Sequence, residues 1–145
     1  SKNMKITKFE KSDFDSLENL KAKAWSTADK EHYGEIQPVF FKEEFTLTAK
    51  EGDEVVGYIT VICDSGVAQI EPLMVDPDKK GQGIGSALLQ EAEKMAKEKG
   101  VHKLWLETGE DWKAKEFYLK HGYTVRADLP NHTGGYNFVL MDKMI

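Results

Sequence analysis

At 145 residues, with 40% hydrophobic and 31% charged residues, the chain has the size and composition of one globular domain, which we expect to span residues 4–145. Its 20 basic and 25 acidic side chains give a net charge of −5, which argues against a nucleic-acid partner and mildly favours a cationic substrate. No apolar run approaches the roughly 20 residues of a membrane span and no signal peptide opens the sequence, so we expect a cytoplasmic protein without a membrane partner.

The cysteine and histidine side chains indicate neither thiol nor metal chemistry. Cys63 is the only cysteine, which excludes an internal disulfide, and its place in an apolar run predicts a buried thiol rather than a nucleophile. The histidines have no spacing typical of metal ligands, so each is interpreted as a surface or packing residue and no metal is expected. They are His32, His102, His121 and His132.

The N-terminal part of the chain predicts one strand followed by helices. Residues 4–9 alternate well enough for a strand, and Asp13 is a plausible N-cap for the helix after it. A second, short helix is predicted at 39–45. Between the two helices, the aromatic side chains of Trp25 and Tyr33 either line a substrate pocket or pack a helix onto a sheet, and packing is the more common role.

The next part of the chain predicts three antiparallel strands. Residues 45–51 and 55–63 are joined by the turn Gly52-Asp53, which is a hairpin pattern. A second turn at 64–66 leads into another strand at 67–75. These strands precede the most informative stretch of the sequence.

Three glycines on alternate positions, Gly81, Gly83 and Gly85, follow the strand, and a helical pattern then runs without another glycine to Gly100. Glycine permits positive φ and a close approach of the backbone to a ligand. The free N–H groups and the dipole of a helix's first turn favour a phosphate group. The loop therefore predicts a site for a phosphorylated ligand.

Two familiar nucleotide-binding loops fit this spacing poorly. A P-loop needs a lysine after its second glycine, and none follows Gly83 or Gly85. A dinucleotide-binding loop needs a glycine at the position of Ser86, and no clean strand with an acidic end follows. The structural alternative is a plain glycine-rich turn that caps an amphipathic helix.

The second half of the chain predicts further helices and strands. The helix after the loop has a one-sided apolar stripe, and the strand at 103–108 should lie parallel to that at 67–75 because a helix connects them. The remaining predicted elements are a helix at 112–121, capped by Asp111 and closed by Gly122, and strands at 123–129 and 136–141.

Two segments resemble the motifs of one enzyme superfamily. Residues 80–85 resemble the Arg/Gln-x-x-Gly-x-Gly/Ala motif of the GNAT superfamily of acyl-CoA-dependent N-acyltransferases, with Lys80 in place of the usual Arg or Gln. Residues 111–123 resemble the superfamily's Asn-x-x-Ala-x-x-Phe-Tyr-x-x-x-Gly-Phe segment, with Asp111 in place of the usual Asn. The two segments have the superfamily's order and spacing, and the resemblance is weakest near the N-terminus.

The resemblance implies an α/β (α+β) fold with a mixed, mostly antiparallel sheet of about seven strands, helices on both faces, and a central splay between the strands at 67–75 and 103–108. It also implies acetyl-CoA as co-substrate. The residues expected to bind it are Leu73, Met74, Val75, Lys80, Gly81, Gln82, Gly83, Ile84, Gly85, Ser86, Asp111, Ala114 and Phe117. Asp111 can cap a helix but cannot donate a hydrogen bond to the pantetheine arm as Asn would.

Two side chains match catalytic roles of the superfamily. Glu71 stands where some members carry a carboxylate proposed as general base, and Pro72 beside it lacks a ladder N–H, which fits a local bulge. Tyr118 matches the tyrosine thought to protonate the departing thiolate. The alternatives are a solvated strand carboxylate for Glu71 and a core aromatic for Tyr118.

The function implied is direct transfer of an acetyl group from acetyl-CoA to a primary amine, and the expected acceptor is a small cationic molecule such as a polyamine. One alternative is acetylation of a protein N-terminus or lysine. A second, of another class, is a non-catalytic CoA-binding sensor, which would need neither Glu71 nor Tyr118. A small-molecule amine is thus the expected partner. The oligomeric state stays open between a monomer and a homodimer.

Overall fold

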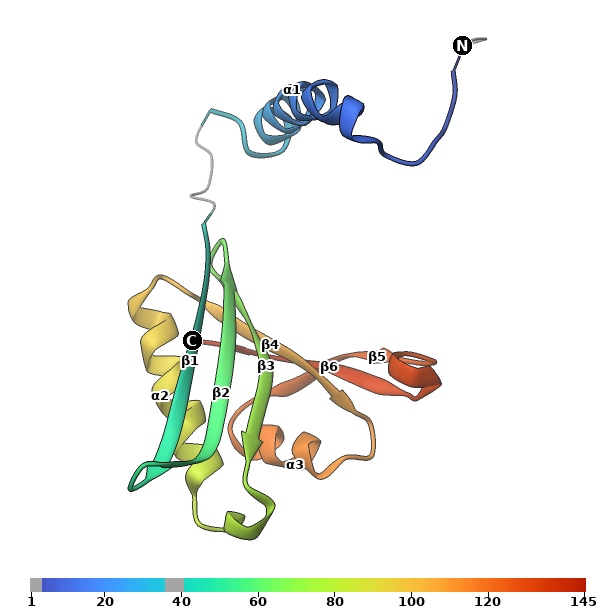
Figure 1. Cartoon of the computed structure of the whole chain (residues 1–145). Helices are drawn as coiled ribbons and strands as arrows, with labels where there is room; N and C mark the ends of the chain where they lie inside the picture. Colours follow the sequence, from blue (N-terminus) through green and yellow to red (C-terminus); the bar gives the residue numbers. More distant parts are fainter. Residues whose placement is uncertain (1–3, 36–40) are drawn as a thin grey trace. The chain divides into compact units, whose positions relative to one another are not determined.

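The computed structural model describes residues 4–35 and 41–145. The chain divides into two compact units between residues 39 and 40. The described residues contain three α-helices and six strands, together with three short 3-10 turns (Figure 1). That residues 4–145 act as a single domain stays a prediction.

The N-terminal unit consists mainly of one long helix. Residues 4–10 form neither helix nor strand, so the strand predicted at 4–9 is wrong; an alternating pattern makes a stable strand only with neighbouring strands to pair with. A 3-10 turn, η1 (Lys11–Asp13), leads into α1 (Phe14–Tyr33). The Asp13 carboxylate accepts a hydrogen bond from the Glu10 N–H at 2.9 Å and so closes η1 instead of capping α1 as predicted.

The C-terminal unit is built on a six-stranded sheet with the strand order β1-β2-β3-β4-β6-β5. The strands are β1 (Lys42–Glu51), β2 (Glu54–Asp64), β3 (Val67–Val75), β4 (Lys103–Gly109), β5 (Thr124–Leu129) and β6 (Phe138–Met144). Every neighbouring pair is antiparallel except β3 and β4, which are parallel as predicted. The mixed, mostly antiparallel sheet is confirmed, with six strands rather than about seven in the described part of the chain.

The short helix predicted at 39–45 is wrong in its described part. Lys42 to Phe45 pair with Asp64 to Val61 and begin β1. Residues 39 and 40 lie outside the described residues. The spacing of Phe41 and Phe45 fits one face of a helix, but positions four apart also share one face of a strand, and the pairing with β2 decides between them. The final strand, predicted at 136–141, begins two residues later and continues to Met144.

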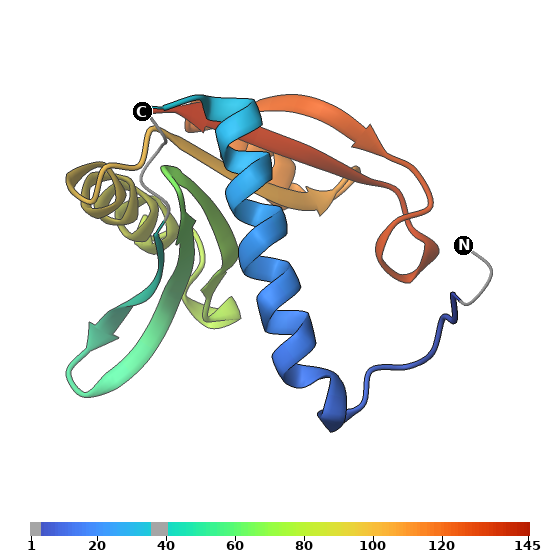
Figure 2. The ribbon, with the colours of Figure 1, turned by 90° about the horizontal axis from the view of Figure 1, so that it is seen from above.

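Both helices of this unit, α2 (Ile84–Glu98) and α3 (Lys113–Lys120), pack on one face of the sheet, and a helix on the other face stays a prediction. Figure 2 shows α2 alongside the β1–β2 hairpin. Buried side chains from four strands and both helices meet there, among them Ile59, Val61, Cys63, Ala68, Ile70, Leu89, Ala92, Leu104, Leu106, Tyr118, Val139 and Met141. The prediction of a buried Cys63 thiol is confirmed, and burial raises its pKa.

The ends of the two helices follow the sequence in part. Gly100 and Gly122 come just after them with φ of 90° and 89°, as expected for closing glycines. The predicted cap at Asp111 is wrong, because the Trp112 N–H bonds to the Gly109 carbonyl in a turn and α3 starts only at Lys113 without a side-chain cap. Within the described residues, no helix combines the length and the apolar composition that crossing a membrane requires.

The parallel strands β3 and β4 separate after a short paired stretch. Three pairs join them: Val67 with Lys103, Ala68 with Leu104, and Gln69 with Trp105. On its other side β3 has a register shift against β2, where Glu71 and Pro72 together occupy the space opposite Thr60. The predicted bulge and the predicted splay are therefore confirmed, and Figure 1 shows β4 turning away from β3.

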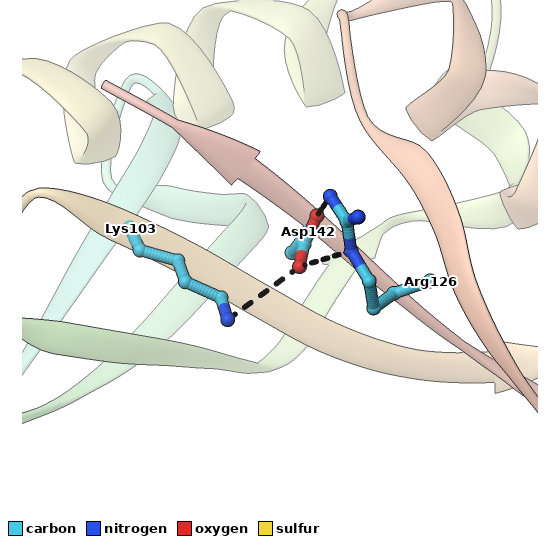
Figure 3. Close-up of polar contacts among 3 residues, drawn as sticks. All are labelled: Lys103, Arg126 and Asp142. Carbon is cyan, nitrogen blue, oxygen red and sulfur yellow. Dashed lines mark hydrogen bonds and ion pairs between the residues drawn. The ribbon is translucent and has the colours of Figure 1, made fainter.

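A buried carboxylate joins the last three strands of the sheet. Asp142 of β6 is 2% exposed and accepts hydrogen bonds from Nε and Nη2 of Arg126, each at 2.9 Å (Figure 3). Lys103 of β4 lies 3.5 Å from the same carboxylate. Arg126 lies at a register shift between β5 and β6. The Arg126–Asp142 ion pair therefore holds the edge strand β5 to β6 in addition to the backbone hydrogen bonds between these strands.

Candidate active site

A cavity of about 460 Å³ lies where β3 ends in the C-terminal unit. Its wall combines the end of β3, the loop after it, the start of α2 and one side of α3. The lining residues are Leu73, Met74, Val75, Lys79, Lys80, Gly81, Gly83, Ile84, Gly85, Ser86, Lys113, Ala114, Phe117 and Tyr118. The cavity thus brings together Tyr118 and all of the predicted cofactor-binding residues except Gln82 and Asp111.

The loop between β3 and α2 forms part of the wall of this cavity. The Asp76 carboxylate accepts a hydrogen bond from the Asp78 N–H at 2.9 Å and shapes the turn η2 (Pro77–Lys79). Gly83, the N-cap of α2, has a φ of 79°, which side chains rarely adopt. The Ala87 N–H donates to the Gly83 carbonyl, so the three N–H groups before it have no acceptor within the helix. Free N–H groups at a helix start favour an anion, as the sequence predicts for this loop.

Three lysines add positive charge around this site: Lys79, Lys80 and Lys113. Lys79 is also paired with Glu51 of β1 at 3.0 Å, and this hydrogen bond raises the pKa of Lys79. Only Lys80 belongs to a recognised motif position. Lys79 and Lys113 each stand next to a predicted site residue in the sequence, which is the signal that could have identified them.

Tyr118 is both a core residue and a lining residue of the cavity. Its side chain is 6% exposed, and its ring packs edge-on against Phe117 and Tyr123 with centroids 5.2 and 5.3 Å apart. Burial raises the pKa of the Tyr118 phenol, so the group carries its proton at neutral pH. Among the residues that the structure describes, none forms a hydrogen bond with its hydroxyl. The phenol can therefore donate to a bound molecule.

A strand end, a glycine loop on a helix start and a buried tyrosine beside them match the motifs singled out in the sequence. Residues 9–123 fit the model of the acetyltransferase (GNAT) family. The chain belongs to this family. An acyl-CoA-dependent acetyltransferase family, the α+β fold and the superfamily resemblance are thereby confirmed.

Known relatives of this GNAT chain agree in fold. An acetyltransferase from Bacillus cereus ATCC 14579 has a crystal structure that matches all of both chains, with 26% identity and a TM-score of 0.76. A GNAT family acetyltransferase from Elizabethkingia anophelis, solved with acetyl-CoA bound, matches 69% of this chain and 75% of its own, with 22% identity and a TM-score of 0.64.

One curated relative is an N-acetyltransferase of Methanocaldococcus jannaschii whose name calls it uncharacterized. It is 31% identical over 130 residues, which cover 78% of this GNAT chain. The match spans 57% of the relative, little more than half of its length.

Several predicted site residues of the GNAT chain do not line the cavity. Gln82 lines a second cavity of about 640 Å³ between β1 and α2. Asp111 is exposed in the turn before α3, and Glu71 is exposed at the bulge of β3. Trp25 and Tyr33 belong to α1 in the other unit. The roles of these five residues, like those of the predicted residues that line the cavity, stay predictions.

One residue of the site region was interpreted from sequence as a surface or packing histidine. His121, just after α3, places Nε2 2.9 Å from Oγ of Ser86, which lines the cavity. No motif pointed to it, because the contact joins residues 35 positions apart.

Proposed function

We propose that this GNAT chain transfers the acetyl group of acetyl-CoA directly to a primary amine. The observation that carries the proposal is one cavity lined by the first residues of α2, by three lysines and by Tyr118. Family membership supports acetyl-CoA as the donor, and the Elizabethkingia relative with acetyl-CoA bound supports the same ligand for this fold.

The cavity residues fit the chemistry of a CoA ester. Its pyrophosphate would be held by the N–H groups of Ile84, Gly85 and Ser86, with Lys80 contributing charge. Beyond Gln69, β3 has no partner on the side of β4, so its backbone at Leu73–Val75 is available to pair with the amide groups of an extended ligand arm. The edge of β3 can thus donate hydrogen bonds to the amide carbonyls of the ligand arm, and the start of α2 can donate to the pyrophosphate that follows it.

Proton removal from the amine is the first chemical requirement. Acetyl-CoA supplies a thioester carbonyl, which only a neutral amine attacks, whereas an alkylammonium has a pKa of about 10.4. Glu71 is the proposed base and acts through water, because its carboxylate is exposed at the bulge and does not line the cavity. A solvated carboxylate without a role is the alternative, and a pH profile separates the two.

Proton delivery to the sulfur is the second requirement. As the N–C bond forms, the C–S bond breaks and its electron pair stays on sulfur. Tyr118, protonated and without a hydrogen-bond partner among the described residues, would donate its proton to this thiolate and recover one from solvent. The nitrogen gives up two protons, one when the ammonium becomes a neutral amine and one as the N–C bond forms, and the proposed route for them is Glu71 and water. Tyr118 takes one proton back, so the overall reaction releases one proton.

The proposed acceptor is a small cationic amine, such as a polyamine. The net charge of −5 supports it. Glu71 and Glu107 also support it, since each lies two positions beyond the last pair of β3 and β4, at the opening between the strands. An acidic opening attracts a cation. A peptide N-terminus or lysine is the alternative acceptor, and a non-catalytic CoA sensor is the alternative of another class.

An amine panel tests the proposal. The full chain is incubated with acetyl-CoA and single polyamines, amino acids, lysine peptides or N-terminal peptides, with free-thiol release and product mass as readouts. We expect release with a small di- or polyamine above the hydrolysis background. Transfer only to peptides would support the protein acceptor, and tight acetyl-CoA binding without transfer to any member would support the sensor.

A further inference from the structure

His121 is held between α3 and the first turn of α2. Its Nδ1 lies 2.8 Å from the carbonyl oxygen of Phe117, and its Nε2 lies 2.9 Å from Oγ of Ser86. The imidazole also stacks on the Phe117 ring with centroids 4.4 Å apart and planes 34° apart. Both ring nitrogens are therefore engaged, and one of their partners lines the ligand cavity.

These contacts determine where the protons are. A carbonyl oxygen only accepts, so Nδ1 must carry a hydrogen and donate it to Phe117. A neutral imidazole has a single N–H, which leaves Nε2 as an acceptor for the Ser86 hydroxyl proton. With His121 neutral, the Ser86 hydroxyl thus turns its proton away from the cavity and presents lone pairs to it.

A bound phosphate reverses this requirement. Phosphate oxygens accept hydrogen bonds, so Ser86 can bind one only by turning its proton into the cavity. Nε2 then faces the lone pairs of Oγ and keeps the contact only if it carries a hydrogen of its own. The arrangement that satisfies Phe117, Ser86 and the phosphate together is the doubly protonated imidazolium, which also adds positive charge behind the phosphate.

We propose that His121 is a positioning residue that couples binding of a phosphate-bearing ligand in this cavity to the uptake of a proton from solvent. The coupling rests on the proposed function in that acetyl-CoA is the ligand expected to supply the phosphate. Ser86 is the group through which the coupling acts.

Charged side chains also stand on the elements that carry or border His121 and Ser86. They are Glu93 of α2, Lys120 of α3, Lys143 of β6, which lies beside Gly122, and the cavity lysines Lys79, Lys80 and Lys113. Glu93 and Lys143 pair with each other at 2.8 Å. Within the described part of the chain, none of these side chains forms a hydrogen bond with the imidazole.

Calorimetry of acetyl-CoA binding tests the coupling. Titrations of the full chain near pH 7, in two buffers of different ionisation enthalpy, count the protons taken up per ligand bound. The ligand's own phosphate, with a second pKa of about 6, contributes equally in every variant. We expect wild type to take up more protons, by up to about one, than His121→Gln or Ser86→Ala. The exposed His102→Gln variant should behave like wild type.

Nitrogen-15 NMR of wild type keeps the test decisive if His121→Gln fails to fold. We expect the neutral His121 of the free protein to be the Nδ1–H tautomer and to become doubly protonated on adding acetyl-CoA at constant pH. An Nε2–H tautomer, or an unchanged protonation state in the complex, overturns the inference.

The outcomes separate this inference from the proposed function. Binding with equal proton uptake in wild type and His121→Gln overturns the coupling and leaves acetyl transfer standing. Proton uptake with no transfer to any amine overturns the function and leaves the coupling standing. Absence of acetyl-CoA binding overturns both.

Discussion

Gln69 of β3 and Trp105 of β4 form the last backbone pair between these strands, and the sheet opens beyond it. On the helix side, buried residues such as Ile70 and Leu106 continue the core. Glu71 and Glu107 share the other face with Gln69 and Trp105, because side chains alternate along a strand. Glu71 and Glu107 therefore stand on the sheet face opposite the core, one on each strand that borders the opening.

Replacing Gly83 with valine tests the anion site. A side chain at φ 79° is strained, and reshaping of the loop moves the N–H groups at the start of α2. We expect acetyl-CoA affinity to fall about tenfold or more, measured by calorimetry. Gly100→Val is the matched control, since Gly100 has φ 90°, open space around it and a place at the far end of α2. An unchanged affinity in Gly83→Val contradicts the assignment.

Replacing Tyr118 with phenylalanine separates catalysis from packing. The ring and its contacts with Phe117 and Tyr123 remain, so stability and acetyl-CoA affinity should survive. Without the hydroxyl, the chemical step should slow about 10²–10⁴-fold in single-turnover transfer at saturating acetyl-CoA.

The control for this change is Tyr123→Phe, which removes a buried hydroxyl that donates to Glu93 at 3.2 Å outside the cavity. It should cost stability and leave the chemical step near the wild-type rate. Tyr118→Phe rates within a factor of about two of wild type would return Tyr118 to a purely structural role.

Replacing Glu71 with glutamine tests the base. If the carboxylate accepts the amine's proton, the rate should fall at neutral pH and part of the defect should vanish as the pH approaches the amine's own pKa, about 10.4 for an alkylamine. Glu107→Gln is the comparison, because Glu107 follows Trp105 by two positions on β4, as Glu71 follows Gln69 on β3. An equal defect of Glu71→Gln at every pH points to substrate binding, and a pH-dependent defect confined to Glu107→Gln moves the base to β4.

Replacing Asp142 with asparagine tests the buried ion pair. The hydrogen bond from Arg126, with the charges of Arg126 and Lys103, lowers the pKa of Asp142 against the opposing effect of burial. We expect the free energy of unfolding to fall by about 1–3 kcal/mol at neutral pH, as for lost hydrogen bonds to charged groups. Denaturant titration measures it.

The pH dependence of this loss has a defined sign. A carboxyl whose pKa is lowered by folding stabilises the protein above its unfolded value of about 3.9, and the contribution disappears as the pH falls through the lower folded pKa. The stability gap between wild type and Asp142→Asn should therefore be constant above about pH 5 and narrow in acid. Asp53→Asn, in the exposed β1–β2 turn, should show no comparable gap.

Local chemistry along the chain determined much of this protein. Gly83 adopts a positive φ between a strand and a helix, and Gly100 and Gly122 end helices because glycine tolerates positive φ. Pro72 interrupts the hydrogen bonding between β2 and β3 because it has no backbone N–H. Each of these effects depends on near neighbours in sequence. The glycine loop, both C-terminal helices, the hairpins and the bulge at Pro72 could therefore be predicted, whereas the splay was implied by the resemblance to the GNAT superfamily.

Only the tertiary structure decided which distant groups meet. A strand at 4–9 and a helix at 39–45 were wrong because pairing partners, and not local pattern, select between strand, helix and coil. Ser86 meets His121 only because the start of α2 and the end of α3 come together in the fold, and Asp142 meets Arg126 at a register shift between β5 and β6. Such contacts depend on the packing of whole elements to within a hydrogen-bond length, which residue type and spacing do not specify.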